Sequence, residues 1–148
     1  MATFAKAGYN AATYALARPT YPRALFERIL AFHRGPTRLC ADVGCGTGQV
    51  ALEPVLRKRF ERIVGVEPSS VMVQKARDVL QREQSDEALK AQIEFVQAGA
   101  EELDTVLEPG SVDLLVVAQA AHWFDWHKVW PQIGRVLRPG GTYALIVS

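Results

Sequence analysis

Apolar residues along the chain follow two patterns: short continuous runs, and stretches in which they recur at every third or fourth position. Continuous runs bounded by turn residues are typical of buried β-strands, whereas the wider spacing is typical of amphipathic helices. The runs predict strands at 38–43, 62–66, 93–97, 112–118 and 142–148. The run Val112–Ala118 is so continuous that we expect a central parallel strand covered on both faces.

The helical spacing predicts helices between these strands. They are expected over 22–33, from about Thr47 past Pro54, from Ser69 or Ser70 to about Leu80, and over 127–137. Pro54 fits its helix only in or near the first turn, or at a kink. The remaining connections are a polar segment or continued helix at 84–90, a short turn at 100–103, and the segment Arg138–Gly141, which is expected to end the last helix.

The alternation of strands and helices indicates a single α/β domain over 1–148, with a doubly wound parallel sheet and right-handed crossovers. We assign 22–148 to its core. Residues 1–21 carry aromatic side chains among small residues without a clear period, so we expect them to form an N-terminal arm.

The first strand runs into a glycine-rich turn, and the second ends on an acidic residue, Glu67. A carboxylate roughly twenty positions after such a turn is typical of a nucleoside-binding unit. Gly44, Gly46 and Gly48 follow the order G-x-G-x-G, and Gln49 stands where a dinucleotide-binding turn has its third glycine. The pattern therefore indicates an adenosine-type ligand and disfavours a nicotinamide-dependent oxidoreductase. The alternative is that the glycines only form a tight turn, since glycine adopts positive φ without strain.

Composition narrows the function further. The net charge of +1, with 22% charged residues, gives no electrostatic field for nucleic acid. We expect Arg57–Arg59 and Arg62 to be solvated positions at a helix end. No apolar run is long enough to indicate a membrane span or a signal peptide. Cys40 and Cys45 lack metal-site spacing, so both are expected to be reduced thiols in a cytoplasmic protein without bound metal.

Six segments, in order along the chain, resemble the trans-aconitate-methyltransferase-like branch of class I S-adenosylmethionine-dependent methyltransferases. They are 14–22, 42–48, 65–69, 99–103, 119–125 and 135–141. The segment Asp42–Gly48, D-V-G-C-G-T-G, is similar to the first motif of that family. The resemblance implies a Rossmann-like sheet with strand order 3-2-1-4-5 and S-adenosylmethionine across the carboxyl ends of its strands.

The resemblance also implies which residues bind the cofactor. The predicted cofactor site consists of Tyr14, Arg18, Asp42, Gly44, Cys45, Gly46, Gly48, Glu67, Pro68, Gly99, Ala100, Glu101, Gln119 and Ala120. Tyr14 and Arg18 would form a lid over the methionine part, unless Tyr14 only packs and Arg18 is a surface residue. Glu67 would accept hydrogen bonds from the ribose hydroxyls, unless it only caps the following helix. Residues 99–101 match the loop that reads adenine, with glycine where the family often has aspartate or serine.

The segment after the fourth strand is expected to face the methyl acceptor. By resemblance, Gln119 and Ala120 lie beneath the methyl group, while His122, Trp123 and Phe124 line the pocket of a small-molecule acceptor. His122 is the candidate catalytic base, which is needed only when the acceptor must lose a proton. The favoured alternative is that His122 and Trp123 anchor the loop, because a carboxylate acceptor is already ionised at neutral pH.

Members of this family usually continue through a sixth and a seventh strand, which this chain lacks. We therefore expect an unpaired edge at the last strand, covered in a homodimer or by a partner chain. The predicted function is methyl transfer from S-adenosylmethionine to a small molecule, such as a carboxylic acid or a secondary metabolite. The alternative is a truncated methyltransferase-like protein that keeps the nucleoside site and serves as a partner subunit or catalyses another reaction.

Overall fold

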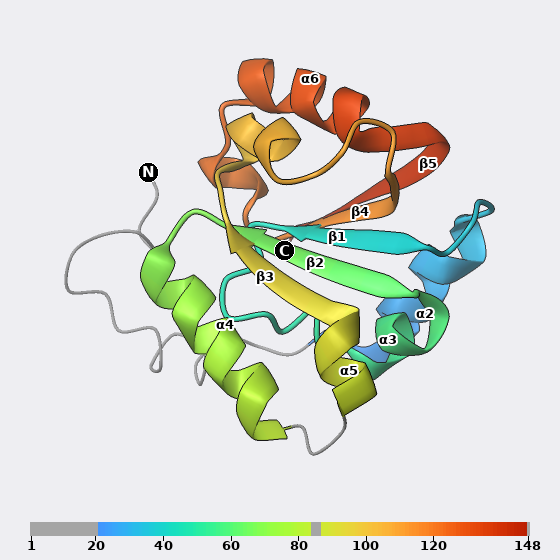
Figure 1. The fold of residues 1–148 in the computed structure, drawn as a ribbon. Helices are drawn as coiled ribbons and strands as arrows, with labels where there is room; N and C mark the ends of the chain where they lie inside the picture. Colours follow the sequence, from blue (N-terminus) through green and yellow to red (C-terminus); the bar gives the residue numbers. More distant parts are fainter. Residues whose placement is uncertain (1–20, 84–86, 148) are drawn as a thin grey trace.

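The computed structural model describes residues 21–83 and 87–147, which form a parallel sheet between two layers of helices (Figure 1). Its five strands pair in the order β3-β2-β1-β4-β5, and every pair is parallel. The strands are β1 (Leu39–Val43), β2 (Arg62–Glu67), β3 (Ile93–Gln97), β4 (Val112–Ala118) and β5 (Leu137–Ile146). The predicted α/β class and strand order are therefore confirmed.

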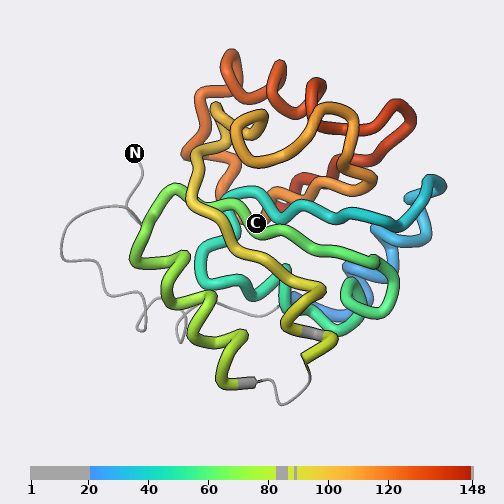
Figure 2. The backbone as a smooth tube through the Cα atoms, in the orientation of Figure 1, coloured from blue at the N-terminus to red at the C-terminus, as the bar shows by residue number. Residues whose placement is uncertain are grey.

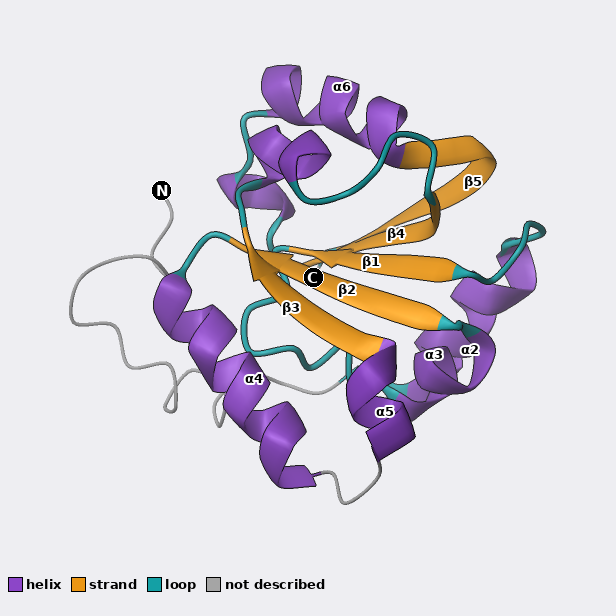
Figure 3. Cartoon of the chain, in the orientation of Figure 1, coloured by secondary structure: helices purple, strands orange, loops and turns teal. Residues whose placement is uncertain are grey.

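Helices cover both faces of this sheet (Figure 3). One layer contains α2 (Arg23–Phe32), α3 (Pro54–Arg59), α4 (Ser70–Glu83) and α5 (Glu87–Gln92). The other contains the 3-10 helices η2 (Ala100–Thr105) and η3 (Ala121–Trp123), together with α6 (Trp126–Val136). The polar segment before the third strand therefore includes a helix of its own, α5.

Two apolar clusters fill the spaces between the sheet and the helix layers, and β4 contributes to both. Leu114 and Val116 belong to the cluster that includes residues of α2, α3 and α4. Leu115 and Val117 belong to the cluster that includes residues of η2 and α6. All residues of β4 are buried, so the prediction of a central strand covered on both faces is confirmed. The backbone trace in Figure 2 shows the same layering without the ribbons.

The helix predicted from about Thr47 begins later, at Pro54. Residues 46–52 form turns instead, because the glycines of this region adopt positive φ and interrupt helical geometry. The backbone N–H of Ala51 donates to Oδ2 of Asp42 at 3.0 Å rather than to a helical carbonyl. Pro54 lies at the start of α3, where its missing N–H costs no helical hydrogen bond.

The last strand begins earlier than predicted. The segment Arg138–Gly141, predicted to end the preceding helix, belongs to β5, which starts at Leu137. The pairing is irregular there, because Val112 faces Leu137 whereas Leu114 faces Thr142. More residues of β5 than of β4 span this step, so the segment forms a bulge at the start of the strand.

Asp113 holds the amino ends of three strands together. Asp113 is only 1% exposed. One carboxylate oxygen, Oδ2, accepts the backbone N–H groups of Arg38 at 2.8 Å and Leu39 at 3.0 Å. The other, Oδ1, accepts Nε of Arg138 at 2.7 Å. Because a buried charge is costly unless it is paired, these bonds account for a carboxylate in an apolar strand, and the ion pair explains why β5 begins early.

At the edge of the sheet, β5 exposes apolar side chains, as predicted for the last strand. Tyr143, Leu145 and Val147 are exposed, and Trp130 of α6 meets the Tyr143 ring edge-on, with ring centroids 5.3 Å apart. The homodimer or partner chain expected to cover this edge stays a prediction.

Candidate functional site

The predicted cofactor residues that the structure describes lie where β1, β2, β3 and β4 end. In a parallel sheet these carboxyl ends share one edge, so the glycine turn, Glu67, the loop after β3 and the loop after β4 are brought together. Tyr14 and Arg18 lie outside the described residues, so their expected role as a lid stays a prediction.

The glycine turn follows β1 directly and is fastened to β2. The backbone N–H groups of Gly44 and Cys45 donate to the carbonyl oxygen of Val66 at 2.7 and 3.0 Å. Gly44, Gly46 and Gly48 have φ of 71°, 55° and 89°, the left-handed region that other residues adopt only with strain. A Cβ at Gly48 would stand 2.7 Å from the ring of Phe95, so this position requires glycine for space as well.

Glu67, at the end of β2, is 5% exposed and accepts backbone hydrogen bonds through both carboxylate oxygens. Oε1 accepts the N–H of Gly46 at 2.9 Å, and Oε2 accepts the N–H of Ser69 at 2.9 Å. The cap of α4 is Ser69, whose Oγ accepts the N–H of Met72 at 3.3 Å. Glu67 therefore joins the glycine turn to the start of α4.

Asp42 supports the glycine turn from inside the sheet. It is buried in β1, and its Oδ2 accepts the N–H of Ala51 at the far end of the turn. Its negative charge also affects Cys40 in the same strand: burial, and then the charge of Asp42, raise the pKa of the Cys40 thiol far above its usual range. Cys40 and Cys45 are both buried and are not joined in a disulfide.

The loop after β3 lies beside Glu67. The backbone N–H of Ala98 donates to the carbonyl oxygen of Glu67 at 3.1 Å, and Nε2 of Gln97 donates to the carbonyl oxygen of Pro68 at 3.1 Å. Gly99 caps η2, Ala100 is buried and Glu101 is exposed. The segment predicted to read adenine is thus fastened to the residue predicted to bind ribose.

The loop after β4 reaches the glycine turn. Gln119 has φ of 65°, the only positive φ of a non-glycine residue within the described segments, and its N–H donates to the carbonyl oxygen of Ile146 at 2.9 Å. A Cβ on Gly44 would stand 2.6 Å from Cβ of Ala120 and 3.6 Å from the ring of Phe124. Ala120 and Phe124 therefore lie against the turn.

His122 and Trp123 differ in their surroundings. His122 is exposed, whereas Trp123 is half-buried against the cluster beneath α6, and their ring centroids are 4.9 Å apart. The interpretation that His122 and Trp123 anchor the loop stays a prediction. Sequence reasoning missed Trp126, whose Nε1 donates to the carbonyl oxygen of Ala121 at 3.0 Å and whose ring packs 5.4 Å from that of Phe124. No spacing pattern in the sequence signals this contact.

Within residues 21–83 and 87–147, no group of three or more histidine, cysteine, aspartate or glutamate side chains is placed to hold a metal ion. No helix in the same residues combines the length and the apolar character that crossing a membrane requires.

A family model described as "Methyltransferase domain" matches residues 41–145. CRG1 of Saccharomyces cerevisiae, named a probable S-adenosylmethionine-dependent methyltransferase, is 33% identical over 136 residues, which are 92% of this chain and 44% of that protein. A candidate methyltransferase of Dictyostelium discoideum is 34% identical over 137 residues, 93% of this chain and 46% of that protein. A solved structure of a candidate type II methyltransferase from Anaeromyxobacter dehalogenans has 38% identity and a TM-score of 0.67, covering 86% of this chain and 48% of that one.

The chain spans about half the length of these relatives. The family model covers most of the described sheet, from within β1 to within β5, and includes the glycine turn, Glu67 and the loop after β4. The chain therefore belongs to the class I S-adenosylmethionine-dependent methyltransferase family.

Proposed function

We propose that this chain binds S-adenosylmethionine at the carboxyl ends of β1, β2 and β4, and that its methyl group is transferred to a small organic molecule. The observation that carries the proposal is Glu67. A buried carboxylate at the end of β2, in contact with a glycine turn, is the arrangement that accepts both hydroxyls of a ribose.

The described residues fit such a cofactor in three respects. The glycine turn, whose positive φ values glycine adopts without strain, lies at the carboxyl ends of the strands, where parallel sheets bind ligands. Glu67 lies at the end of β2 and is joined to that turn by the hydrogen bond from the N–H of Gly46. Gln119 holds a strained backbone conformation in the loop that packs against the turn, and such strain is typically retained at functional positions.

S-adenosylmethionine would supply an electrophilic methyl group bonded to a sulfonium sulfur. What the protein adds is position: the acceptor must approach the methyl carbon in line with the bond that breaks, and correct placement supplies most of the rate. The half-buried ring of Phe124, beside Gly44, would provide an apolar wall for such an acceptor.

We propose a carboxylic acid as the acceptor, in keeping with the resemblance to the trans-aconitate-methyltransferase-like branch. A carboxylate is ionised at neutral pH and needs no general base. This agrees with the exposed position of His122, which contacts Trp123. His122 would then shape the rim of the pocket without moving a proton.

Calorimetry tests the cofactor first, with S-adenosylmethionine, S-adenosylhomocysteine and NAD titrated separately into the protein. We expect the two sulfur compounds to bind and NAD not to bind. If neither sulfur compound binds, the proposal is wrong. Transfer is then tested with methyl-labelled S-adenosylmethionine and a panel of small carboxylic acids that includes trans-aconitate. Cofactor binding without a labelled product from any acid would contradict methyl transfer to this class and favour a nucleoside-binding partner subunit.

A further inference from the structure

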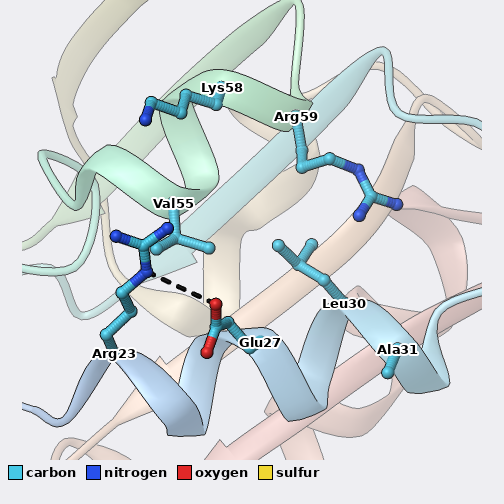
Figure 4. Close-up of a pocket in the computed structure, with 7 residues that line it drawn as sticks. All are labelled: Arg23, Glu27, Leu30, Ala31, Val55, Lys58 and Arg59. Atoms are coloured by element: carbon cyan, nitrogen blue, oxygen red, sulfur yellow. Dashed lines mark hydrogen bonds and ion pairs between the residues drawn. The ribbon is translucent and has the colours of Figure 1, made fainter.

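A groove runs between α2 and α3, on the face of the sheet that also carries α4 (Figure 4). Its volume is about 320 Å³, and its lining includes the cations Arg23, Lys58 and Arg59 together with Leu30 and Val55. None of its lining residues belongs to the predicted cofactor site, so an occupant of this groove leaves that site open. Of these cations, Lys58 and Arg59 were expected only to be solvated positions at a helix end.

The cations of the groove are available to a partner. Arg23 forms an ion pair with Glu27 at 3.3 Å, but both side chains are more than half exposed, at 68% and 56%, and exposed pairs of this kind contribute little. Lys58 and Arg59 make no ion pair within the described part of the chain. The lining of the groove therefore includes three positive side chains and one carboxylate, in a protein whose net charge is only +1.

The floor of the groove is apolar. Leu30 is 5% exposed and belongs to the core, and Val55 packs against the same cluster. On the other flank of α2, a second groove is lined by Phe32, which is 73% exposed, and Arg34. Phe32, the last residue of α2, and Arg34, which follows the helix, thus add an exposed ring and a further cation, and cations beside apolar side chains suit an amphipathic partner better than a polar one.

The cations stand at both ends of the groove. In Figure 4, Arg23 lies beside Val55 at one end and Arg59 lies near Leu30 and Ala31 at the other. Arg23 and Ala31 are two helical turns apart on α2, or about 12 Å at 1.5 Å per residue. A partner helix with carboxylates seven or eight residues apart can therefore reach both ends while apolar residues between them cover the floor.

We propose that the groove between α2 and α3 docks an acidic amphipathic helix of a partner protein. Opposite charge gives the partner its orientation, and the apolar floor gives it an anchor. A nucleic acid fits less well, because its backbone would place phosphates over Glu27 and over a floor without hydrogen-bond donors. The proposal is independent of the function proposed for the cofactor site.

The test uses a fluorescein-labelled helical peptide with glutamates at positions i and i+7 beside a leucine seam, and a matched peptide with lysines at those positions. Fluorescence anisotropy measures binding of each to the whole chain. We expect the glutamate peptide to bind at least tenfold more tightly than the lysine peptide. The double variant Lys58→Glu/Arg59→Glu should lose at least tenfold in affinity for it, while Arg82→Glu/Lys128→Glu, an equal charge change at exposed positions elsewhere, should stay within twofold.

Unchanged thermal unfolding and unchanged S-adenosylhomocysteine binding of the groove variant, relative to the wild type, confirm that the variant is folded. Equal affinity for both peptides, or an equal loss in both double variants, overturns the proposal. So does a double-stranded DNA oligonucleotide that competes with the peptide at equal concentration, which would make the groove a nucleic-acid surface. A dimer in sedimentation that the groove variant abolishes would assign the groove to a second copy of the chain and also overturn it.

Discussion

Replacing Glu67 by glutamine tests the link between the glycine turn and the start of α4. The substitution keeps the shape of the side chain, but it leaves one acceptor oxygen where the carboxylate has two and adds two N–H donors. The backbone N–H groups of Gly46 and Ser69 both lie 2.9 Å from the carboxylate, one on each oxygen. Glutamine cannot accept both of them in this arrangement.

The size of the effect follows from these two bonds. One buried N–H loses its acceptor, which costs about 1–3 kcal/mol. The other keeps an acceptor that is neutral instead of charged, at a further cost of about 1 kcal/mol. We therefore expect the free energy of unfolding to fall by about 2–4 kcal/mol, less than the 5–15 kcal/mol or so that is typical of a domain. The variant should remain folded and bind S-adenosylhomocysteine roughly tenfold more weakly, equivalent to about 1.4 kcal/mol.

Urea unfolding without ligand measures stability, and calorimetry with S-adenosylhomocysteine measures affinity in the same preparation. Glu61→Gln is a suitable control, because Glu61 is exposed and its substitution should change stability by no more than about 0.5 kcal/mol. If Glu67→Gln changes stability as little as the control does, the structural link is refuted. If the variant is folded and its dissociation constant is unchanged, Glu67 does not belong to the cofactor site.

Three further predictions concern other buried or strained positions. Asp113→Asn should lower the free energy of unfolding by about 2–4 kcal/mol, because Arg138 loses its counter-charge. The exposed control Asp78→Asn should lower it by less than about 0.5 kcal/mol. Similar urea midpoints for the two variants would contradict this prediction. Burial raises the pKa of Cys40, so the thiolate is disfavoured in the folded state; stability is complete below about pH 8.5, the usual pKa of a thiol, and falls as pH rises above it. Urea unfolding between pH 7 and 10 should therefore show a steeper decline for the wild type than for Cys40→Ala, and parallel profiles would be evidence against the shift. Gln119→Gly relieves the backbone strain of a positive φ and should change the free energy of unfolding by less than about 1 kcal/mol. Calorimetry should show weaker S-adenosylhomocysteine binding by this variant. A stability loss above about 2 kcal/mol would assign the Gln119 side chain a structural role instead.

The spacing of apolar residues correctly predicted the elements that this spacing alone determines. The continuous apolar run of β4 and the helical spacing of α4 correspond to the elements observed, with Ser69 as the cap of α4. The helix after β1 was predicted too early, because the apolar spacing from Thr47 onward takes no account of positive φ in the preceding glycines or of the bond from Ala51 to Asp42. Pro54 marks where the helix begins.

The elements that were predicted incorrectly depend on contacts between residues that are distant in the sequence. Arg138 was read as part of a turn that ends a helix, but its ion pair with Asp113 brings the segment into β5. Asp113 itself was read as one position of an apolar run, although a single carboxylate in such a run is a signal for a buried ion pair. In the candidate site, the motif predicted Glu67 and the glycines, whereas the bond from Trp126 to the carbonyl oxygen of Ala121 could not be inferred from spacing.

The bonds of Asp113 also bear on how the domain folds. Its carboxylate joins Arg38, 75 positions earlier in the chain, to Arg138, 25 positions later. No single hairpin or helix–strand unit contains all three residues, so this centre exists only when β1, β4 and β5 have assembled. Until then Asp113 must remain hydrated, and its burial accompanies the closing of the sheet. The amino edge of the sheet therefore favours all-or-none folding, in which a fragment that ends before Arg138 would have to bury a carboxylate without its cation.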